Sequence, residues 1–374
     1  MNTPKIAVFL PSLEGGGAER VFVELCGEFA ALGYDVDLVL AAARGPYLAE
    51  VSPRVRIVDL RANGVLSSLP RLVRYLRSAR PDVMLSGLDH ANIMAIVACA
   101  AAGGRTRCVI SMRSVPTVVT EVDWSVRSWT ILQIVKFVYR YADAIIGNAR
   151  AVVDDLAQFR RVPASKVAVI YNPLDLDRIV LASHAAVDNP WLSDGAPPVV
   201  LSVGALTVRK DFPTLIRAFA LVRAKRNCRL VILGEGPDRA ALESLLRNLG
   251  IDREVILPGF VNNPFAWMRR ARVFVSSSLN EGCPNALMQA LACGTPVVST
   301  ACPGGSAEIL EGGKWGRLVA PGNVSEMAEA IVASITETNR LNVQQRAADF
   351  ALASIAREYL QILLPSRMSA EHRS

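Results

Sequence analysis

The sequence predicts an α/β protein with two doubly wound, Rossmann-like domains. Along most of the 374 residues, short continuous apolar runs alternate with segments of helical period, as expected for parallel strands that helices cover on both faces. This alternation stops near residues 174–197 and then starts again. A chain of this length is also too long for one ordinary core. We therefore expect one domain at residues 1–175 and a second at residues 176–374.

Seven apolar runs in the first half are predicted strands. The first run, KIAVFL, precedes the glycine turn EGGGAE and a helix from about Arg20 to Leu32, which Gly33 ends. The predicted strands are residues 5–10, 35–41, 55–60, 82–87, 107–111, 143–148 and 167–172. Because most of these runs are separated by helical segments, they indicate a parallel sheet.

The second half repeats the pattern after an irregular crossing. Residues 174–197 are polar, contain prolines and have no strand period, which is typical of a segment between domains. The predicted strands are residues 198–204, 228–234, 254–259, 272–278, 295–300 and 316–321. The predicted helices are about Phe212–Lys225, Arg239–Leu249, Pro264–Arg270, Ala286–Cys293 and Val324–Ile335. One further helix, at about residues 344–364, follows the second sheet and could pack back onto the first domain.

The composition indicates a globular protein of the cytosol. Hydrophobic residues make up 51% of the chain and charged residues 20%, which excludes disorder. The apolar run Ile6–Leu10 is too short for a signal peptide, and no apolar run reaches the roughly 18 residues of a membrane-spanning helix. The seven cysteines have no CxxC spacing and lie mostly in apolar surroundings, so we expect reduced, buried thiols. Three histidines without metal-ligand spacing predict no zinc site.

The positive charge gathers in the first domain, where residues 54–113 hold ten arginines against three aspartates. Arg71, Arg74 and Arg77 recur at helical spacing, so they form a basic stripe that could face anionic lipid or a phosphorylated substrate. A solvated helix face is the alternative. Nucleic acid is disfavoured as a partner because no aromatic residues alternate with these arginines. Nothing in the sequence indicates an oligomeric state.

The strongest site signal is a predicted helix start in the second domain. Residues 279–298 read LNEGCPNALMQALACGTPVV and follow a strand that ends in three serines. Asn285 begins the helix, so the first backbone N–H groups, at about residues 285–287, offer an anion site. Gly282 allows the anion to approach the backbone. Glu281 accepts hydrogen bonds and suits sugar hydroxyls beside that anion.

This segment resembles the donor motif of the retaining glycosyltransferases of family GT4, which have the GT-B fold of two Rossmann-like domains facing each other across a cleft. Further similar segments, in the family's order, are GGGAERVFVELCGEFAALGYDV, VIYNPLD, LSVGALTVRKDFPTLIRAFA, LVILGEGPDRAALESLL and VILPGFVNNPFAWM. The resemblance implies a hexosyltransferase that uses a nucleotide-diphosphate sugar, with a UDP-sugar favoured and a GDP-sugar as the alternative.

The resemblance also implies roles for residues of the second domain. Glu281 contacts the donor hexose, and Lys210 neutralises the diphosphate as the sugar leaves. The implied backbone contacts to the diphosphate are Gly282, Cys283, Pro284, Asn285, Ala286 and Leu287. Gly204 lies in the same donor loop as Lys210, and Gly259, Phe260 and Val261 match the loop along the nucleobase. Phe260 as a core residue, Lys210 as a solvated lysine, and Glu308 as a helix cap or a donor contact remain alternatives.

The sequence departs from the family at two donor positions. Gln289 stands where the family usually has a glutamate that binds the ribose diol, so the charge-assisted part of that contact is lost. Ala205 stands where the family commonly has an arginine. Arg209, next to Lys210, could supply the missing charge, although neighbouring side chains often point apart. We predict that Gln289→Glu tightens donor binding modestly.

Residues of the first domain are assigned by the same resemblance. Gly16 and Gly17 belong to a glycine loop whose backbone approaches the donor. Arg113 takes a position where some relatives carry a histidine that faces the sugar, and a salt-bridge role is its alternative. His90 lies near a strand end, where a helix cap or a buried histidine is the more common role. Residues 123–144, with aromatic and basic side chains, could lie at a membrane interface or form an ordinary buried helix.

These assignments predict a metal-independent, retaining transferase without a cofactor beyond the nucleotide sugar itself. No DxD-type cluster follows a predicted strand, so Lys210, Arg209 and a helix start would stabilise the leaving diphosphate. The expected acceptor is a glycan or lipid-linked saccharide, with peripheral contact to the inner face of the cytoplasmic membrane. A catalytically weakened nucleotide-sugar-binding scaffold is the alternative, favoured by Ala205 and Gln289. An epimerase or phosphorylase would need other groups.

Overall fold

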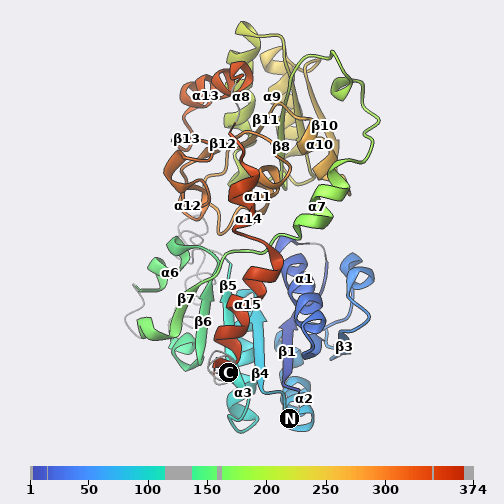
Figure 1. Cartoon of the computed structure of the whole chain (residues 1–374), viewed down its shortest axis with the longest axis vertical. Helices are drawn as coiled ribbons and strands as arrows, with labels where there is room; N and C mark the ends of the chain where they lie inside the picture. Colours follow the sequence, from blue (N-terminus) through green and yellow to red (C-terminus); the bar gives the residue numbers. More distant parts are fainter. Residues whose placement is uncertain (1–2, 15, 114–136, 158–161, 339–340, 366–374) are drawn as a thin grey trace. The chain divides into compact units, whose positions relative to one another are not determined.

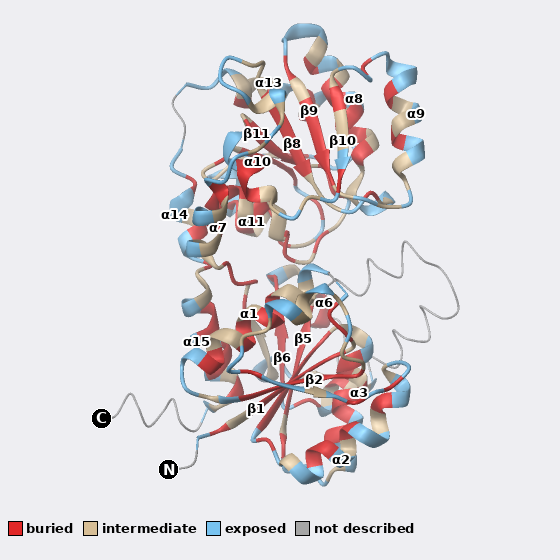
Figure 2. Cartoon of the chain, turned by 90° about the vertical axis from the view of Figure 1, so that its right-hand side faces the viewer, coloured by how far each residue is buried: buried red, intermediate tan, exposed pale blue. Residues whose placement is uncertain are grey.

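The computed structural model describes residues 3–14, 16–113, 137–157, 162–338 and 341–365. The chain divides into two compact units, Met1–Pro173 with Leu352–Ser374 and Leu174–Ala351 (Figure 1). Each unit contains one parallel sheet with helices packed on it, so the predicted α/β fold class is confirmed. The strands of both sheets are largely buried, and the helices carry the exposed surface (Figure 2).

The first unit has a seven-stranded sheet in the order β3-β2-β1-β4-β5-β6-β7. The strands are β1 Lys5–Leu10, β2 Asp35–Leu40, β3 Arg56–Asp59, β4 Val83–Gly87, β5 Arg107–Met112, β6 Ala144–Gly147 and β7 Val167–Val169. All neighbouring strands pair in parallel. The strand order reverses direction between β1 and β4, and ligands of doubly wound folds bind at the carboxyl ends of such strands.

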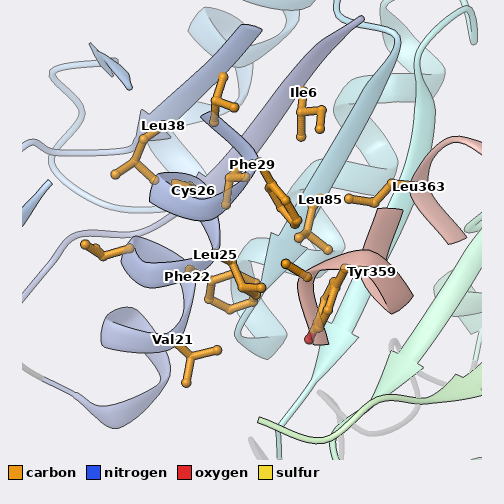
Figure 3. Close-up of a cluster of buried hydrophobic side chains, with 14 of the residues drawn as sticks. Ile6, Val21, Phe22, Leu25, Cys26, Phe29, Leu38, Leu85, Tyr359 and Leu363 are labelled. Carbon is orange, nitrogen blue, oxygen red and sulfur yellow. The ribbon is translucent and has the colours of Figure 1, made fainter. Parts of the chain in front are cut away.

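Helices cover both faces of this sheet. On one face, α1 (Gly17–Ala31) and α15 (Leu352–Leu363) pack together over side chains such as Ile6, Leu38 and Leu85 (Figure 3). On the other face lie α2 (Leu69–Ala79), α3 (Asp89–Ala101) and α6 (Arg150–Ala157). The alternation of strand side chains between these two apolar layers explains the continuous apolar runs in the sequence.

The second unit has a six-stranded sheet in the order β10-β9-β8-β11-β12-β13. The strands are β8 Val199–Val203, β9 Arg229–Leu233, β10 Val255–Gly259, β11 Val273–Ser276, β12 Val297–Thr300 and β13 Arg317–Val319. These neighbours also pair in parallel. The order reverses between β8 and β11, so the carboxyl ends of these two strands mark the candidate site of this unit.

Except for the short α12, which was not predicted, the helices that lie between β8 and the end of α13 agree closely with the sequence prediction. They are α8 Phe212–Lys225, α9 Arg239–Leu249, α10 Pro264–Arg270, α11 Asn285–Ala292, the short α12 Ser306–Ile309 and α13 Val324–Thr336. Asp211 caps α8, since its side chain accepts the N–H of Thr214, and Asn323 caps α13 in the same way. Local capping therefore marks the starts of α8 and α13.

The C-terminal segment differs from its prediction. One helix was expected at about residues 344–364, but the structure has α14 (Gln344–Ala348) and α15 (Leu352–Leu363). Between them, the carbonyl of Phe350 accepts the N–H of Leu174 at 2.7 Å, and Ala351 pairs with Leu174 as a β-bridge. α14 contacts α11 of the second unit, whereas α15 contacts α1 of the first. Tertiary pairing has therefore interrupted a helical pattern.

The predicted crossing at residues 174–197 contains a helix that the sequence analysis missed. α7 spans Leu176–Ser183, and the Asp175 side chain accepts the N–H of Arg178 as its cap. α7 contacts α10 and α11 of the second unit. Its short length and its exposed Leu181, 78% accessible, hid the helical period.

The basic stripe on α2 is used partly for structure. Arg71 donates to the carbonyls of Leu60 and Arg61, and Arg77 donates to the carbonyl of Ala101 at 2.7 Å. These hydrogen bonds tie α2 to neighbouring loops. Arg71 and Arg77 are therefore neither simply solvated nor simply available to an anionic lipid or substrate. Arg74 is exposed.

The cysteines agree with the expectation from the sequence. All seven cysteines are buried and free, as predicted. Among the helices that the structure describes, we find none with the length and apolar character needed to cross a membrane. Most of the aromatic segment 123–144 lies outside the described residues.

Candidate functional site

Three charged side chains meet at the carboxyl ends of β8 and β11. The loop after β8 carries Arg209 and Lys210 in a short 3₁₀ turn, Val208–Lys210, and the loop after β11 carries Glu281. Arg209 Nη1 lies 2.8 Å from Glu281 Oε2, and Lys210 Nζ binds Glu281 Oε1. The cluster therefore occupies the point where the strand order of the second sheet reverses.

The positions of Lys210 and Arg209 resolve two questions that the sequence left open: whether Lys210 is solvated and whether the two side chains point apart. Lys210 is not a solvated surface lysine, because its side chain is only 16% exposed and pairs with a buried carboxylate. Arg209 and Lys210 are neighbours in the chain, yet both side chains reach Glu281. Both cations therefore lie close enough together to bind the same anionic group of a bound substrate.

Glu281 is a buried carboxylate that stays ionised. Its side chain is 6% exposed, and burial alone would raise its pKa. The positive charges of Lys210 and Arg209, with hydrogen bonds from Lys210 and Ser278, outweigh burial and bring the pKa below its ordinary value. Ser278 Oγ donates to Glu281 Oε1 at 2.7 Å. The carboxylate is therefore available as a hydrogen-bond acceptor at neutral pH.

The serines at the end of β11 tie the two loops together. Ser277 Oγ donates to the carbonyl of Lys210 at 2.7 Å, and the N–H of Leu279 donates to the carbonyl of Arg209 at 2.9 Å. In the sequence these serines mark only the end of a predicted strand. Their small side chains after a buried strand were the available signal, since hydroxyls there must find acceptors.

A glycine loop after β12 holds the backbone of Glu281. The N–H of Glu281 donates to Pro303 O at 3.0 Å, and the N–H of Gly305 donates to Gly282 O at 2.7 Å. Gly304 has φ +123°, and a Cβ at this position would lie 1.6 Å from the carbonyl oxygen of Glu281. Only glycine fits there. Glu308 follows in α12, at the end of the same loop.

The helix start predicted from the sequence is present. α11 begins at Asn285, and its first hydrogen bond runs from the N–H of Met288 to the carbonyl of Pro284 at 3.2 Å. The first turn of a helix leaves its amides, here including Ala286 and Leu287, without intrahelical acceptors. Glu281, Lys210 and the start of α11 also line one small pocket with Ser202 and Phe212. Cys283 is buried.

Glycines stand at the carboxyl ends of the three strands β8, β9 and β10. The side chain of Lys210 passes Gly204, where a Cβ would lie 3.1 Å from Lys210 Cε. Gly234, which the sequence analysis did not single out, has φ +138°, and a Cβ there would lie 2.0 Å from Gly204 O. The N–H of Gly234 donates to Gly259 O at 2.8 Å. A side chain at Gly234 would clash with this backbone, so glycine permits the close approach of the strand ends.

Phe260 stands out at this edge. It follows Gly259, which has φ +89°, and it is 73% exposed. The alternative that Phe260 belongs to the core is therefore wrong. Val261 follows it in the loop before α10. An exposed ring at a strand end can stack on a planar ligand.

The two departures from the family, Ala205 and Gln289, lie in the same unit. Ala205 is exposed directly after Gly204, and Gln289 is half-buried on the second turn of α11. Ala205 thus lies in the loop that leads to Lys210, and Gln289 lies on the helix whose start is the candidate anion site.

Arg113 belongs to the first unit, at the end of β5. Its guanidinium lies 4.4 Å from the ring centroid of Phe22, binds Asn172 Oδ1, and lies 3.5 Å from the Tyr359 hydroxyl. Gly87 provides the space, because a Cβ there would lie 2.0 Å from the Phe22 ring. Among the described residues, Arg113 makes no salt bridge. Within the described ranges, a ring contact and hydrogen bonds, rather than a salt bridge, hold its guanidinium.

The remaining first-unit candidates follow β1 and β4, the strands where that sheet reverses. Gly16 is the N-terminal cap residue of α1 and Gly17 its first residue, and both are exposed. His90 is the second residue of α3 and is also exposed, so it is not a buried histidine. Glu281, Lys210 and Arg209 are brought together in one unit, whereas Gly16, Gly17 and Arg113 belong to the other.

Comparisons with known proteins identify the two halves. A family model described as Glycosyltransferase Family 4 matches residues 15–178, and one described as Glycosyl transferases group 1 matches residues 197–337. The chain is 31% identical, over 96% of its length and 99% of the relative's, to the N-acetylgalactosamine-N,N'-diacetylbacillosaminyl-diphospho-undecaprenol 4-alpha-N-acetylgalactosaminyltransferase of Campylobacter jejuni. It is 27% identical to a lipopolysaccharide core biosynthesis glycosyltransferase of Rhizobium meliloti, over 93% of this chain and 96% of that one.

Solved structures share the fold over nearly the whole chain. HepE of Anabaena, in complex with UDP-glucose, has a TM-score of 0.80 at 20% identity and covers 96% of this chain and 99% of its own. Sucrose-phosphate synthase of Thermosynechococcus elongatus has a TM-score of 0.80 at 21% identity, with 98% and 100% covered. At these identities the likeness concerns the fold.

Proposed function

The chain belongs to glycosyltransferase family 4 and is a glycosyltransferase of the GT-B fold, and we propose that it transfers a hexosyl residue from a nucleotide-diphosphate sugar to a lipid-linked or cell-surface polysaccharide acceptor. The acceptor class includes lipopolysaccharide. The transfer retains the anomeric configuration and needs no metal ion. The observation that carries the proposal is the cluster of Glu281, Lys210 and Arg209 beside the start of α11.

The cluster supplies what departure of a nucleoside diphosphate requires. Negative charge develops on the diphosphate as the glycosidic bond breaks, and Lys210, Arg209 and the first amides of α11 stabilise that charge. Glu281 accepts hydrogen bonds from hydroxyls of the hexose. Because these groups provide positive charge without a metal, EDTA should leave transfer unchanged.

Arg209 compensates for the absence of an arginine at position 205. Its guanidinium already reaches Glu281, the same carboxylate that Lys210 binds. A ligand that replaces Glu281 would therefore meet both cations. Arg209 is 47% exposed, so it can reorient without disturbing the core.

A UDP-sugar is the favoured donor. The structural relative HepE was solved with UDP and with UDP-glucose, and the exposed ring of Phe260 offers a stacking surface for a base at the expected position. A GDP-sugar is the alternative, since stacking does not distinguish the bases.

A lipid-linked acceptor is proposed from relatives and from the surface of the first unit. The Campylobacter relative is named for a diphospho-undecaprenol substrate and the Rhizobium relative for lipopolysaccharide core biosynthesis. Phe137 and Tyr141 are exposed, and the Arg140 guanidinium lies 4.1 Å and 4.6 Å from their ring centroids. Such aromatic and basic groups suit a lipid headgroup layer, so we propose peripheral membrane contact.

Flotation with liposomes tests the membrane contact. The protein should float with liposomes that contain anionic lipid at low salt, and Phe137→Ser with Tyr141→Ser should reduce the floated fraction. Equal flotation of the double variant would remove these residues from the proposed contact.

The central test is release of nucleoside diphosphate from a panel of UDP- and GDP-hexoses, with a lipid-diphosphate saccharide as acceptor. Lys210→Ala should lower kcat by about 10²-fold or more, as expected for loss of a charged group that stabilises the transition state. Lys225→Ala, an exposed lysine at the end of α8, is the matched control. Equal rates for both variants would contradict the proposed role of Lys210.

The second candidate is a nucleotide-sugar-binding scaffold with weakened catalysis. Ala205 and Gln289 favour it, because each replaces a charged residue that the family commonly has. The same assay separates the two candidates. A scaffold would bind a nucleotide sugar in calorimetry but release no diphosphate, with or without acceptor.

A further inference from the structure

We propose that Glu281 competes with the diphosphate for Lys210 and Arg209, and that this competition helps to expel the nucleoside diphosphate after each transfer. This inference rests on the proposed function. It gives Glu281 a second role, in product release, beside its expected contact with the hexose.

The contacts of Glu281 leave little capacity for a sugar. Oε1 accepts from Lys210 and from Ser278 at 2.7 Å, and Oε2 accepts from Arg209 at 2.8 Å. The carboxylate therefore takes the place that a diphosphate would occupy between the two cations. The diphosphate of a nucleotide sugar can bind these cations only if at least one of the ion pairs of Glu281 breaks.

Burial makes that release conditional. Glu281 is 6% exposed, and a buried carboxylate without partners is strongly disfavoured. Glu281 can leave Lys210 and Arg209 only when other donors satisfy its oxygens. An intact nucleotide sugar replaces both sets of partners. Its hexose hydroxyls donate hydrogen bonds to Glu281, and its diphosphate binds Lys210 and Arg209.

The product lacks one of these replacements. After transfer, the nucleoside diphosphate still binds Lys210 and Arg209, but no hexose hydroxyl remains for Glu281. The unsatisfied carboxylate then favours return to its ion pairs, which displaces the diphosphate. Glu281 thus lowers the affinity for product relative to donor.

The backbone around the cluster suits an exchange made by side chains alone. Ser277 holds the carbonyl of Lys210, and Leu279 holds that of Arg209. On the other side, Pro303 O accepts the N–H of Glu281 at 3.0 Å. Both loops are therefore fixed to each other while the three charged side chains change partners.

The experiment compares binding of UDP, GDP and a UDP-hexose to the full chain by calorimetry. Glu281→Gln keeps the shape and removes the charge, so it should bind the nucleoside diphosphate at least about tenfold more tightly than the parent, because two charge-assisted bonds no longer compete. Its affinity for the UDP-hexose should gain less. Glu329→Gln removes one charge from an exposed position on α13 and should leave both affinities unchanged.

Two further variants keep the test decisive. Glu281→Asp retains the charge but shortens the side chain, so it should give a smaller gain in UDP affinity and serves if Glu281→Gln does not fold. Adding Lys210→Gln to Glu281→Gln should abolish the gain. Unchanged or weaker UDP binding by both position-281 variants would overturn the product-release role and leave the transferase proposal intact. No binding of UDP, GDP or UDP-hexose by any protein would overturn both.

Discussion

Gly304→Ala is the sharpest test of how the site is built. Gly304 has φ +123°, and its added Cβ would lie 1.6 Å from the carbonyl oxygen of Glu281. An ordinary carbon–oxygen contact is roughly twice that distance. The backbone of Glu281, or that of residue 304, must therefore move by more than about 1 Å.

The matched control is Gly313→Ala. Gly313 also has a positive φ, +108°, but a Cβ there meets nothing within 4 Å. Both variants should lose roughly 1–2 kcal/mol of unfolding free energy from the left-handed backbone. Only Gly304→Ala should also lose activity, by about 10²-fold, because displacement of a reacting group by 1 Å costs that much.

The assays are urea unfolding followed by circular dichroism and release of nucleoside diphosphate from the preferred donor. Gly304→Ala should be the more destabilised variant, because its clash adds to the cost of the positive φ that both variants share, and the two variants should differ widely in kcat/KM. If Gly304→Ala and Gly313→Ala kept the same kcat/KM, the loop after β12 would not position Glu281, and the reasoning would fail.

Three further outcomes are expected. Gln289→Glu should tighten nucleotide-sugar binding by about 1 kcal/mol, roughly fivefold, since a carboxylate accepts from both ribose hydroxyls; calorimetry checks this, and unchanged affinity would remove Gln289 from the ribose site. Phe260→Ala should weaken UDP binding by about 1 kcal/mol through lost stacking, whereas equal dissociation constants would place the base elsewhere. Burial alone would raise the pKa of Asp37, but hydrogen bonds from Arg56 and Tyr75 bring it below the ordinary 3.8. Its contribution to stability is therefore present above pH 3.8 and is lost as the pH falls through the lower folded pKa. Asp37→Asn should flatten the acid side of the stability profile, and an unchanged profile in urea unfolding from pH 2 to 7 would contradict this.

Local sequence determined the elements and much of their order. Continuous apolar runs are enough to predict strands that are buried on both faces, and the helices Phe212–Lys225, Arg239–Leu249 and Pro264–Arg270 have the bounds that their pattern predicted. The start of α11 at Asn285 was equally predictable from the sequence, because a proline and a glycine precede an apolar helical stretch. The resemblance to the family pointed to Glu281, Lys210 and Arg209 as candidates.

Contacts between distant residues decided what the sequence left open. The break between α14 and α15 depends on Leu174, which lies more than 170 positions away from Phe350 and pairs with its carbonyl. That Arg209 and Lys210 both reach Glu281, 72 and 71 positions further along the chain, depends on the pairing of β8 with β11. Helical and strand periods report only on neighbouring residues, whereas a buried carboxylate is satisfied by whichever donors the sheet order brings beside it.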